Sequence, residues 1–270
     1  MVANTELQRV GLSGWRTGLG NLLRKENRAW WASRRWLVQS VLWTVVVNGF
    51  TALVLFMVPL GAQITGDPTI EKLGLLAVGV QVLLQLGPLA LAVGTIILVQ
   101  DAIIGERQLG VTEWLLSKPV SRSAYVLSKL LAHGLGVLVI LVGLQGALGY
   151  GLLSLLTGES LPLRPYLVGM AGLAVHTLFY LALTLMMGVL TANRHKLLGA
   201  SLGVLLGGVL IAKFLGIVVM LTPWSLDSVL MAAVLGMPLP VPVWLPIGLT
   251  AILSVIFVAV TLVRFERLEF

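Results

Sequence analysis

The chain has 270 residues, of which 58% are hydrophobic and 11% are charged, and its mean hydropathy is +1.00. Soluble domains carry roughly 25% charged residues, so this composition excludes an ordinary soluble protein and indicates a polytopic membrane protein. Cysteine is absent, which excludes a disulfide framework and a thiolate metal site. The first residues lack the apolar core and the cleavage site of a signal peptide, so the first membrane span is expected to direct insertion.

The segment before the first apolar run, residues 14–36, mixes leucine and tryptophan with arginine and lysine. This pattern predicts an amphipathic helix at the membrane interface, because tryptophan settles at headgroup depth and basic side chains meet anionic lipid. Residues 1–36 are therefore assigned to a cytoplasmic N-terminus with membrane lipid as a partner. An anchor is the simpler interpretation of the helix, and contact with a cytoplasmic partner is the alternative.

Six later runs are long and apolar enough to cross a hydrocarbon core of about 30 Å, which takes about 20 helical residues. They are Leu37–Leu60, Leu73–Gln100, Tyr125–Leu156, Pro165–Ala192, Leu197–Leu221 and Val243–Val263. The predicted fold is all-α: an integral membrane domain of six transmembrane helices over residues 37–270. Residues 264–270 form its short C-terminus.

Lysine and arginine are distributed unevenly about these spans. Fifteen of them fall in segments on one side, Lys72 and Arg164 fall on the other side, and Lys213 falls within the fifth run. Because cytoplasmic loops retain positive charge, both termini are predicted to be cytoplasmic, in a multi-pass protein of the inner or plasma membrane. Topology then explains most of the net charge of +7, and no nucleic-acid partner is required.

The connections on the other side are short, and no soluble domain fits between the spans. The longest connection, residues 222–242, is rich in proline and contains the apolar run Val229–Leu235. This run predicts a short helix that lies on the outer interface or dips into it. A structured loop and a re-entrant segment both fit the pattern, and the loop is the simpler interpretation.

Polar residues within the spans are candidates for a transport pathway or for hydrogen bonds between helices. Gln81 and Gln85 share one face of the second helix, and His176 lies near the middle of the fourth. Lys213 is expected about eight residues from the outer end of the fifth helix, from where its side chain can reach the interface. Small residues at a spacing of four allow close helix packing, within the chain or against another chain. On the fifth run these residues are Gly199, Gly203 and Gly207.

Catalytic and metal-binding patterns are missing from the sequence. His133, His176 and His195 form no HExxH motif and have no carboxylate at ligand spacing, so no metal site is expected. There is no G-x-S-x-G nucleophile elbow and no G-x-x-x-x-G-K-[ST] phosphate loop. The chain is therefore not expected to be an enzyme or to hydrolyse ATP.

The segment between the second and third runs, residues 101–122, is unusually charged for the middle of this chain. Its first part predicts the emergence of the second helix into water. Thr112 is then expected to cap a short helix with Glu113 in its first turn, where a carboxylate suits the helix dipole, and Pro119 ends this helix. An apolar patch lies between them: Trp114, Leu115 and Leu116. The result is a short amphipathic helix parallel to the membrane, which either lies on lipid or docks a protein.

The sequence ERQLGVTEWLLSKPVSR, residues 106–122, resembles the signature of ABC transporter permeases of the type-2, export class. The family pattern has Glu-Arg or Glu-Lys, then Gly-Thr, Leu-Leu, Pro-(Val/Leu)-Ser-Arg and Gly-Lys. The matching residues are Glu106, Arg107, Gly110, Thr112, Leu115, Leu116, Pro119, Ser121, Arg122 and Lys129. The chain departs from the pattern at Val111, an extra residue before Thr112, and at Ser128, where glycine is common. The similarity extends to LLRKENR before the first span and to VRFERLEF at the end.

This resemblance implies a permease subunit that pairs with a second copy or a similar permease and binds two copies of a cytoplasmic ABC ATPase. The segment between the second and third spans would be the coupling helix, and ATP and Mg²⁺ would be bound by the ATPase, with no cofactor in this chain. The implied coupling residues are Glu106, Arg107, Gly110, Thr112, Glu113, Trp114, Leu115, Leu116, Pro119 and Arg122. The implied pathway lies between protomers, lined by the second and fifth helices. Export of an apolar or amphipathic substrate by alternating access is preferred, because no ring of charged residues is seen.

Three other functions are open to a chain of this kind. A membrane anchor that transmits force from the same ATPase to extracytoplasmic partners or an accessory protein is the main alternative. An ATP-independent secondary transporter would need titratable residues deep in several helices, and only Lys213 and His176 meet that description. An intramembrane enzyme would need convergent catalytic groups, which the sequence lacks.

Overall fold

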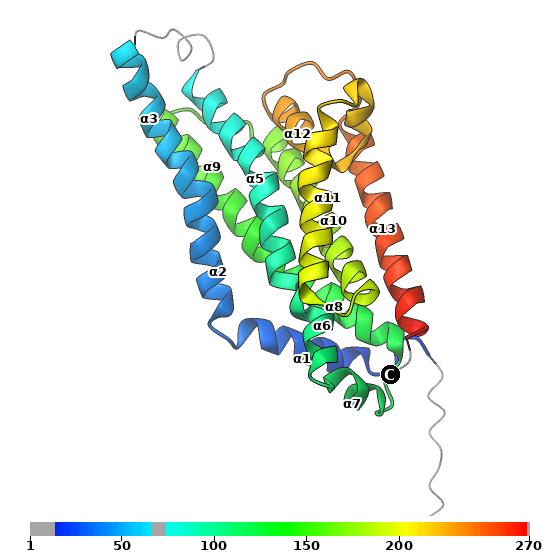
Figure 1. Ribbon diagram of the computed structural model, residues 1–270. Coiled ribbons are helices and arrows are strands. Elements are labelled where there is room, and N and C mark those ends of the chain that lie inside the picture. Colours follow the sequence, from blue (N-terminus) through cyan, green and yellow to red (C-terminus); the bar gives the residue numbers. More distant parts are fainter. Residues whose placement is uncertain (1–13, 66–73, 269–270) are drawn as a thin grey trace, which may run out of the picture.

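The computed structural model describes residues 14–65 and 74–268, and this part of the chain contains helices and no β-strand. Six of its helices are long and apolar enough to cross a membrane, as the sequence predicted. They stand side by side as a bundle, with a further helix lying across its base (Figure 1). Arg9 and Lys72, two of the residues counted for orientation, lie outside the described residues.

The elements follow the predicted order along the chain. They are α1 (Leu19–Trp31), α2 (Arg35–Thr44), η1 (Val45–Gly49), α3 (Phe50–Thr65), α5 (Leu75–Val99), α6 (Asp101–Gln108), α7 (Val111–Leu116), α8 (Arg122–Val137), η2 (Leu138–Gly143), α9 (Leu144–Thr157), α10 (Leu163–Leu190), α11 (Arg194–Ala212), η3 (Gly216–Leu221), η4 (Pro223–Ser225), α12 (Leu226–Val234) and α13 (Trp244–Glu266). The first span joins α2, η1 and α3, the second joins α5 and α6, and the third joins α8, η2 and α9. The remaining spans are α10, α11 and α13.

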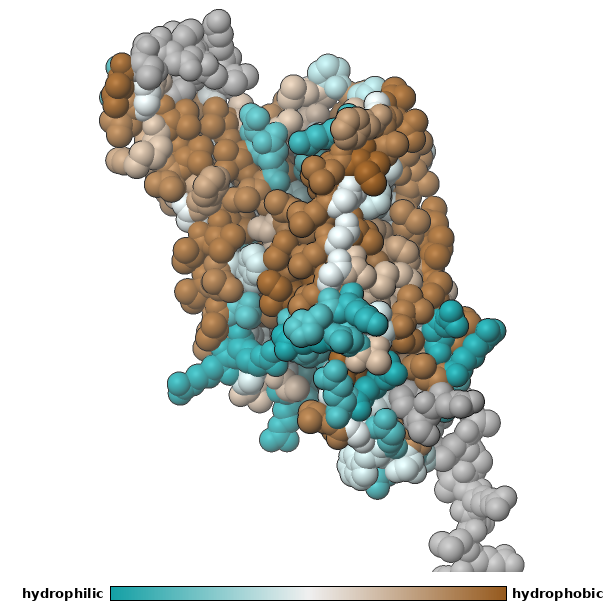
Figure 2. Space-filling model, in the orientation of Figure 1, coloured by the Kyte–Doolittle hydropathy of each residue, from teal (hydrophilic) through white to brown (hydrophobic). Residues whose placement is uncertain are grey.

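The fourth span, α10, is the centre of the bundle and packs against α5, α8, α11, α12 and α13. Of its most apolar 18-residue stretch, 72% is buried, against 28% in the first span and 17% in α13. Large apolar side chains are exposed on these outer spans, among them Val41, Phe56 and Val255. Hydrophobic side chains cover most of the bundle above a belt of hydrophilic ones at its base (Figure 2). Exposed apolar surface of this extent suits contact with lipid.

We call the end that carries α1 and α7 the basic end and the other the opposite end (Figure 1). The segment predicted to form an amphipathic helix contains α1, which lies across the basic end (Figure 1) and packs against α8. Leu22 and Glu26 are buried on its inner face, and the ring of Trp30 packs against Gly136. This helix therefore adheres to the protein through one face, and that face includes a carboxylate.

The fifth span is shorter than predicted. The helix α11 ends at Ala212, and a 3-10 turn over Gly216–Leu221 follows where the sequence suggested continuous helix. The positive φ of 55° at Gly216 marks the break. Lys213 is consequently the residue that ends the helix, so the prediction that it lies well inside the span is wrong.

The proline-rich segment 222–242 contains a helix, as its apolar run predicted. The helix α12 packs against α5 and α10 at the opposite end, with Leu226, Val229 and Leu230 fully buried. Gly172 on α10 gives it room, because a Cβ there would overlap the side chain of Leu230. This segment is part of the packed bundle, and it does not lie free on the surface.

Candidate functional site

The short helix α7 projects from the basic end, beyond α1 (Figure 1). It begins after Gly110, whose φ of 67° turns the chain sharply away from α6. A left-handed φ of this kind is accessible to glycine without steric cost. Thr112 was expected to cap the helix, but it lies within it and no side chain caps the N-terminus. That prediction is wrong, because the turn at Gly110 moves the start of the helix ahead of the threonine.

The two faces of α7 differ sharply. Thr112 and Leu115 are buried, and the Thr112 hydroxyl lies 3.2 Å from the Tyr125 hydroxyl on α8. On the other face Trp114 is 61% exposed, and Lys118 Nζ lies 4.9 Å from the centre of its indole ring. We define the α7 tip as five exposed residues of α7 and its flanks: Leu109, Glu113, Trp114, Lys118 and Pro119. Of the predicted apolar patch, only Trp114 is openly presented, because Leu115 belongs to the core and Leu116 packs against it.

The two arginines of the motif bind the ends of other helices. Arg107 donates to the carbonyl oxygens of Gly188 and Thr191, at 3.5 and 3.4 Å, where α10 ends. Arg122 donates to the carbonyl oxygens of Glu266 and Leu268, at 2.7 and 2.6 Å, where α13 ends. The last carbonyls of a helix lack partners within it and carry partial negative charge, so a guanidinium both satisfies and stabilises them. These arginines tie the base of α7 to two spans.

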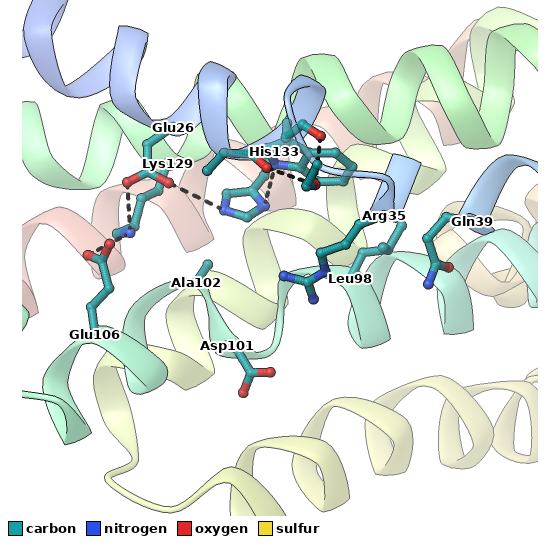
Figure 3. A pocket seen from close by; sticks show the side chains of 12 residues that line it. Glu26, Arg35, Gln39, Leu98, Asp101, Ala102, Glu106, Lys129 and His133 are labelled. Atoms are coloured by element: carbon teal, nitrogen blue, oxygen red, sulfur yellow. Dashed lines mark hydrogen bonds and ion pairs between the residues drawn. The ribbon is translucent and has the colours of Figure 1, made fainter. Parts of the chain in front are cut away.

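Four charged side chains form a cluster between α1, α6 and α8, which we call the charge cluster: Lys25, Glu26, Glu106 and Lys129. Lys129 is fully buried and lies 3.1 Å from Glu26 Oε1 and 2.8 Å from Glu106 Oε2. Figure 3 shows these carboxylates pointing to the same ammonium from α1 and α6. The hydroxyl of Tyr125 donates to Glu106 at 2.7 Å. Glu106 therefore faces the protein interior and joins the segment of residues 101–122 to α1.

Lys25 completes the cluster from its exposed side, with contacts to Glu26 and Glu106. Partial burial by itself would lower the pKa of Lys25. The hydrogen bond to Glu106 and the negative charges of Glu26 and Glu106 outweigh this effect and raise the pKa above its usual value. The cluster thus consists of two cations and two carboxylates, and every member has a partner of opposite charge.

A cleft of about 170 Å³ opens beside the charge cluster, between α1, the start of α2 and the end of the second span (Figure 3). Trp30 donates from its indole nitrogen to His133 Nδ1 at 3.1 Å, so Nδ1 is an acceptor there. Arg35 and Asp101 line the far side of the same cleft. The described residues include no group of His, Asp and Glu that could hold a metal ion.

Of the polar residues predicted within spans, some line a common cavity and others do not. Gln85 and His176 line one cavity near the opposite end, and Gln81 is exposed one turn from Gln85. Lys213 lies outside this cavity. The predicted stripe on α11 is open, because a Cβ at any of its glycines would meet nothing within 4 Å: Gly199, Gly203 and Gly207. The stripe is visible as a pale line down α11 in Figure 2.

Glu26 was not among the residues predicted for the site. It is a single acidic residue between Lys25 and Arg28 in a basic segment, and it is a buried residue of α1. Its spacing from Leu19, Leu22 and Trp30 places it on the helix face with apolar residues, and that pattern was the available signal. Gly208 was also missed, although the ring of Trp224 fills the space where its Cβ would be.

Comparison with known proteins identifies the family. A comparison with curated proteins gives no match. The family model described as ABC-2 family transporter protein matches residues 20–270, which is nearly the whole chain. Members are membrane subunits of ABC transporters, act with an ABC ATPase and in general lack ATPase motifs of their own. The chain therefore belongs to the ABC-2 family of transporter proteins.

Proposed function

We propose that this chain is the permease of an ATP-driven exporter and that its α7 tip docks into a cytoplasmic ABC ATPase, which binds ATP and Mg²⁺. The observation that carries the proposal is the exposure of Trp114 on a short helix whose other face is locked to the bundle. A solvent-exposed tryptophan beside charged residues is the kind of side chain that dominates protein interfaces. The basic end would then face the cytoplasm, and both termini would lie there.

The connections behind the α7 tip support a role in transmission. Glu106 joins the segment to α1 and α8, Arg107 joins it to α10, and Arg122 joins it to α13. A push on α7 therefore acts on several spans at once. Packed interfaces of this kind change by moving between discrete arrangements, which is what a cycle of inward-facing and outward-facing states requires.

The proposal is tested by Trp114→Ala. Truncation of a central interface tryptophan typically costs about 2 kcal/mol or more, so we expect at least a roughly 30-fold weaker association with the ATPase. Trp244→Ala is the matched control, because Trp244 is 67% exposed but lies at the start of α13, at the opposite end. Co-purification from gently solubilised membranes measures the association. Undiminished ATPase recovery with Trp114→Ala would show that α7 only rests on lipid.

We further propose that two copies of the permease pair through the face that carries α11. The open glycines at 199, 203 and 207 and the exposed Gln81 and Gln85 support this arrangement, since α5 and α11 lie at the same face (Figures 1 and 2). Because the chain has no cysteine, Gly203→Cys alone can report the contact by oxidative cross-linking. Val255→Cys, which is 68% exposed on α13, is the control. Equal cross-linking of both variants would refute this interface.

A further inference from the structure

A second cavity, which we call the outer cavity, lies near the opposite end, far from the charge cluster. It has a volume of about 110 Å³ and is lined by residues of α5, α10, α11, η4 and the first turn of α12. Its polar lining is unusual for an apolar bundle. The contributing residues are Gln85, His176, Tyr180, Trp224 and Asp227.

Several buried polar atoms in this lining have no hydrogen-bond partner among the described residues. They are both ring nitrogens of His176, the hydroxyl of Tyr180 and the indole nitrogen of Trp224. His176 faces the carbonyl oxygens of Pro88 and Pro223, and Tyr180 faces Trp224, but none of these contacts has hydrogen-bond geometry. Burial of a polar group without a hydrogen-bond partner is unfavourable, because the group loses its bonds to water. Four such atoms around one cavity indicate that its occupant is polar.

The charge of the cavity selects among polar occupants. Asp227 is half-buried, and within the described ranges it forms no ion pair with a lysine, arginine or histidine. Burial raises the pKa of its carboxyl group, despite the hydrogen bond that Ser228 N donates at 2.7 Å. No lysine or arginine lines the cavity, so an anion would meet only a like charge. A cation would neutralise Asp227 and relieve this cost.

The aromatic rings point to the same class of ligand. The rings of His176 and Tyr180 meet edge to face with centroids 5.0 Å apart, and the indole of Trp224 lies beside them in the lining. Gly208 leaves room for this indole. Tryptophan and tyrosine attract ammonium groups through their ring faces, and clusters of such rings are a common device for binding them. Apolar Leu89, Leu205 and Val209 line the rest of the cavity.

We propose that the outer cavity binds the protonated amine of an amphipathic molecule, with Asp227 as counter-ion, Tyr180 and Trp224 as aromatic walls, and the apolar tail along Leu89 and Val209. Leu89 and Val209 are 38% and 39% exposed, so a tail can leave the cavity along them. This inference rests on the proposed export function and assigns its substrate class: amphipathic organic cations.

A binding assay on the full permease in phosphatidylcholine nanodiscs tests the assignment. The probe is decane-1,10-diamine carrying a dansyl group on one nitrogen, and its matched control is the same molecule with the free amine acetylated. We expect saturable dansyl fluorescence with the amine and at least about tenfold weaker binding of the acetylated molecule. Asp227→Asn should weaken binding of the amine by about tenfold or more, since it removes one partner of a partly desolvated charge pair. Glu159→Gln, at an exposed carboxylate of another connection, should leave it unchanged.

The outcomes decide between the alternatives. Equal binding of the two probes, equal binding by wild type and Asp227→Asn, or no saturable binding at all would each overturn the assignment. If Asp227→Asn does not fold, Trp224→Phe replaces it, because phenylalanine keeps a ring beside Gly208 but removes the indole. Trp224→Phe should weaken binding of the amine probe severalfold. The assay contains no ATPase, so its result is independent of whether Trp114→Ala releases the ATPase.

Discussion

Lys129→Met is the most direct test of how the segment of residues 101–122 is held against α1 and α8. The change substitutes an uncharged side chain of similar length and removes the ammonium group that lies 3.1 Å from Glu26 and 2.8 Å from Glu106. The Lys129 side chain is 2% exposed, and those of Glu26 and Glu106 are 9% and 20% exposed, so water cannot replace the lost charge freely. Removal of one partner of a buried ion pair typically costs about 3–5 kcal/mol.

The value expected here is near the lower end of that range, about 3 kcal/mol, because Lys25 remains beside both carboxylates. Reversible unfolding of the purified permease in mixed micelles, followed by tryptophan fluorescence, measures the free energy of unfolding. Glu106→Gln should cost less, since the pair of Lys129 with Glu26 survives. In the double variant Lys129→Met, Glu106→Gln the two losses should be less than additive. A Lys129→Met protein as stable as wild type, or strictly additive losses, would refute the view that this cluster is one coupled unit.

Three further predictions concern single contacts. Arg122→Ala should lower the unfolding free energy by about 1–3 kcal/mol, because carbonyl oxygens at the end of α13 lose their hydrogen-bond donor. Arg122→Lys should recover little of this free energy, because lysine lacks the planar guanidinium group that can donate to two oxygens at once. The same unfolding assay measures both variants. Gly208→Ala should destabilise the protein and weaken binding of the amine probe, because its Cβ would overlap the indole of Trp224. Gly207→Ala should not destabilise the isolated chain and should raise its stability by up to about 1 kcal/mol, because nothing lies within 4 Å of its Cβ and alanine favours the interior of α11. Lys25→Met should lower the unfolding free energy by an amount that is constant between about pH 7 and about pH 9 and shrinks only at higher pH. The reason is that the pKa of Lys25 is raised in the folded protein: its stabilising effect is complete below the pKa of the unfolded chain and is lost as pH rises through the pKa of the folded protein. A loss that already halves by about pH 9 would contradict this.

The six spans could be predicted because apolar length is a local property. The predicted run Pro165–Ala192 is apolar along nearly its whole length, and the structure has one helix there, Leu163–Leu190. The end of α11 could not be found in this way, because the residues from Gly216 to Leu221 are as apolar as the helix before them. A turn over residues 213–215 and the positive φ at Gly216 separate them, and a glycine within an apolar run is ambiguous in sequence.

The site was predictable in its position but not in its contacts. The motif placed a short helix after the second span, and α7 lies there. Which of Trp114, Leu115 and Leu116 faces water depends on the direction in which Gly110 turns the helix, and this is set by packing against Tyr125. Likewise Glu26 and Lys129 are 103 residues apart, so their pairing follows from the docking of α1 on α8. The sequence shows such charges, but it does not show their partners.

One continuous element connects the two regions of interest. The second span runs from Leu75 to Gln108, so it carries Pro88 in the outer cavity and Glu106 in the charge cluster. At a rise of 1.5 Å per residue these positions are about 27 Å apart along the helix. The fourth span makes a second connection, since His176 lines the cavity and the carbonyl of Gly188 accepts from Arg107.

Two helical spans that reach both regions predict energetic coupling, and coupling between two binding sites must be reciprocal. Binding of the ATPase with a non-hydrolysable ATP analogue should therefore change the affinity for the amine probe, by about 5-fold to 150-fold if the coupling is of usual strength. Glu106→Gln should reduce that change while leaving the affinity in the absence of ATPase intact, because Glu106 does not line the outer cavity. Trp114→Ala provides the limiting case, in which the ATPase no longer docks and the affinity stays at its free value. If ATPase binding is intact and the probe affinity does not respond, the second and fourth spans do not transmit the motion of α7.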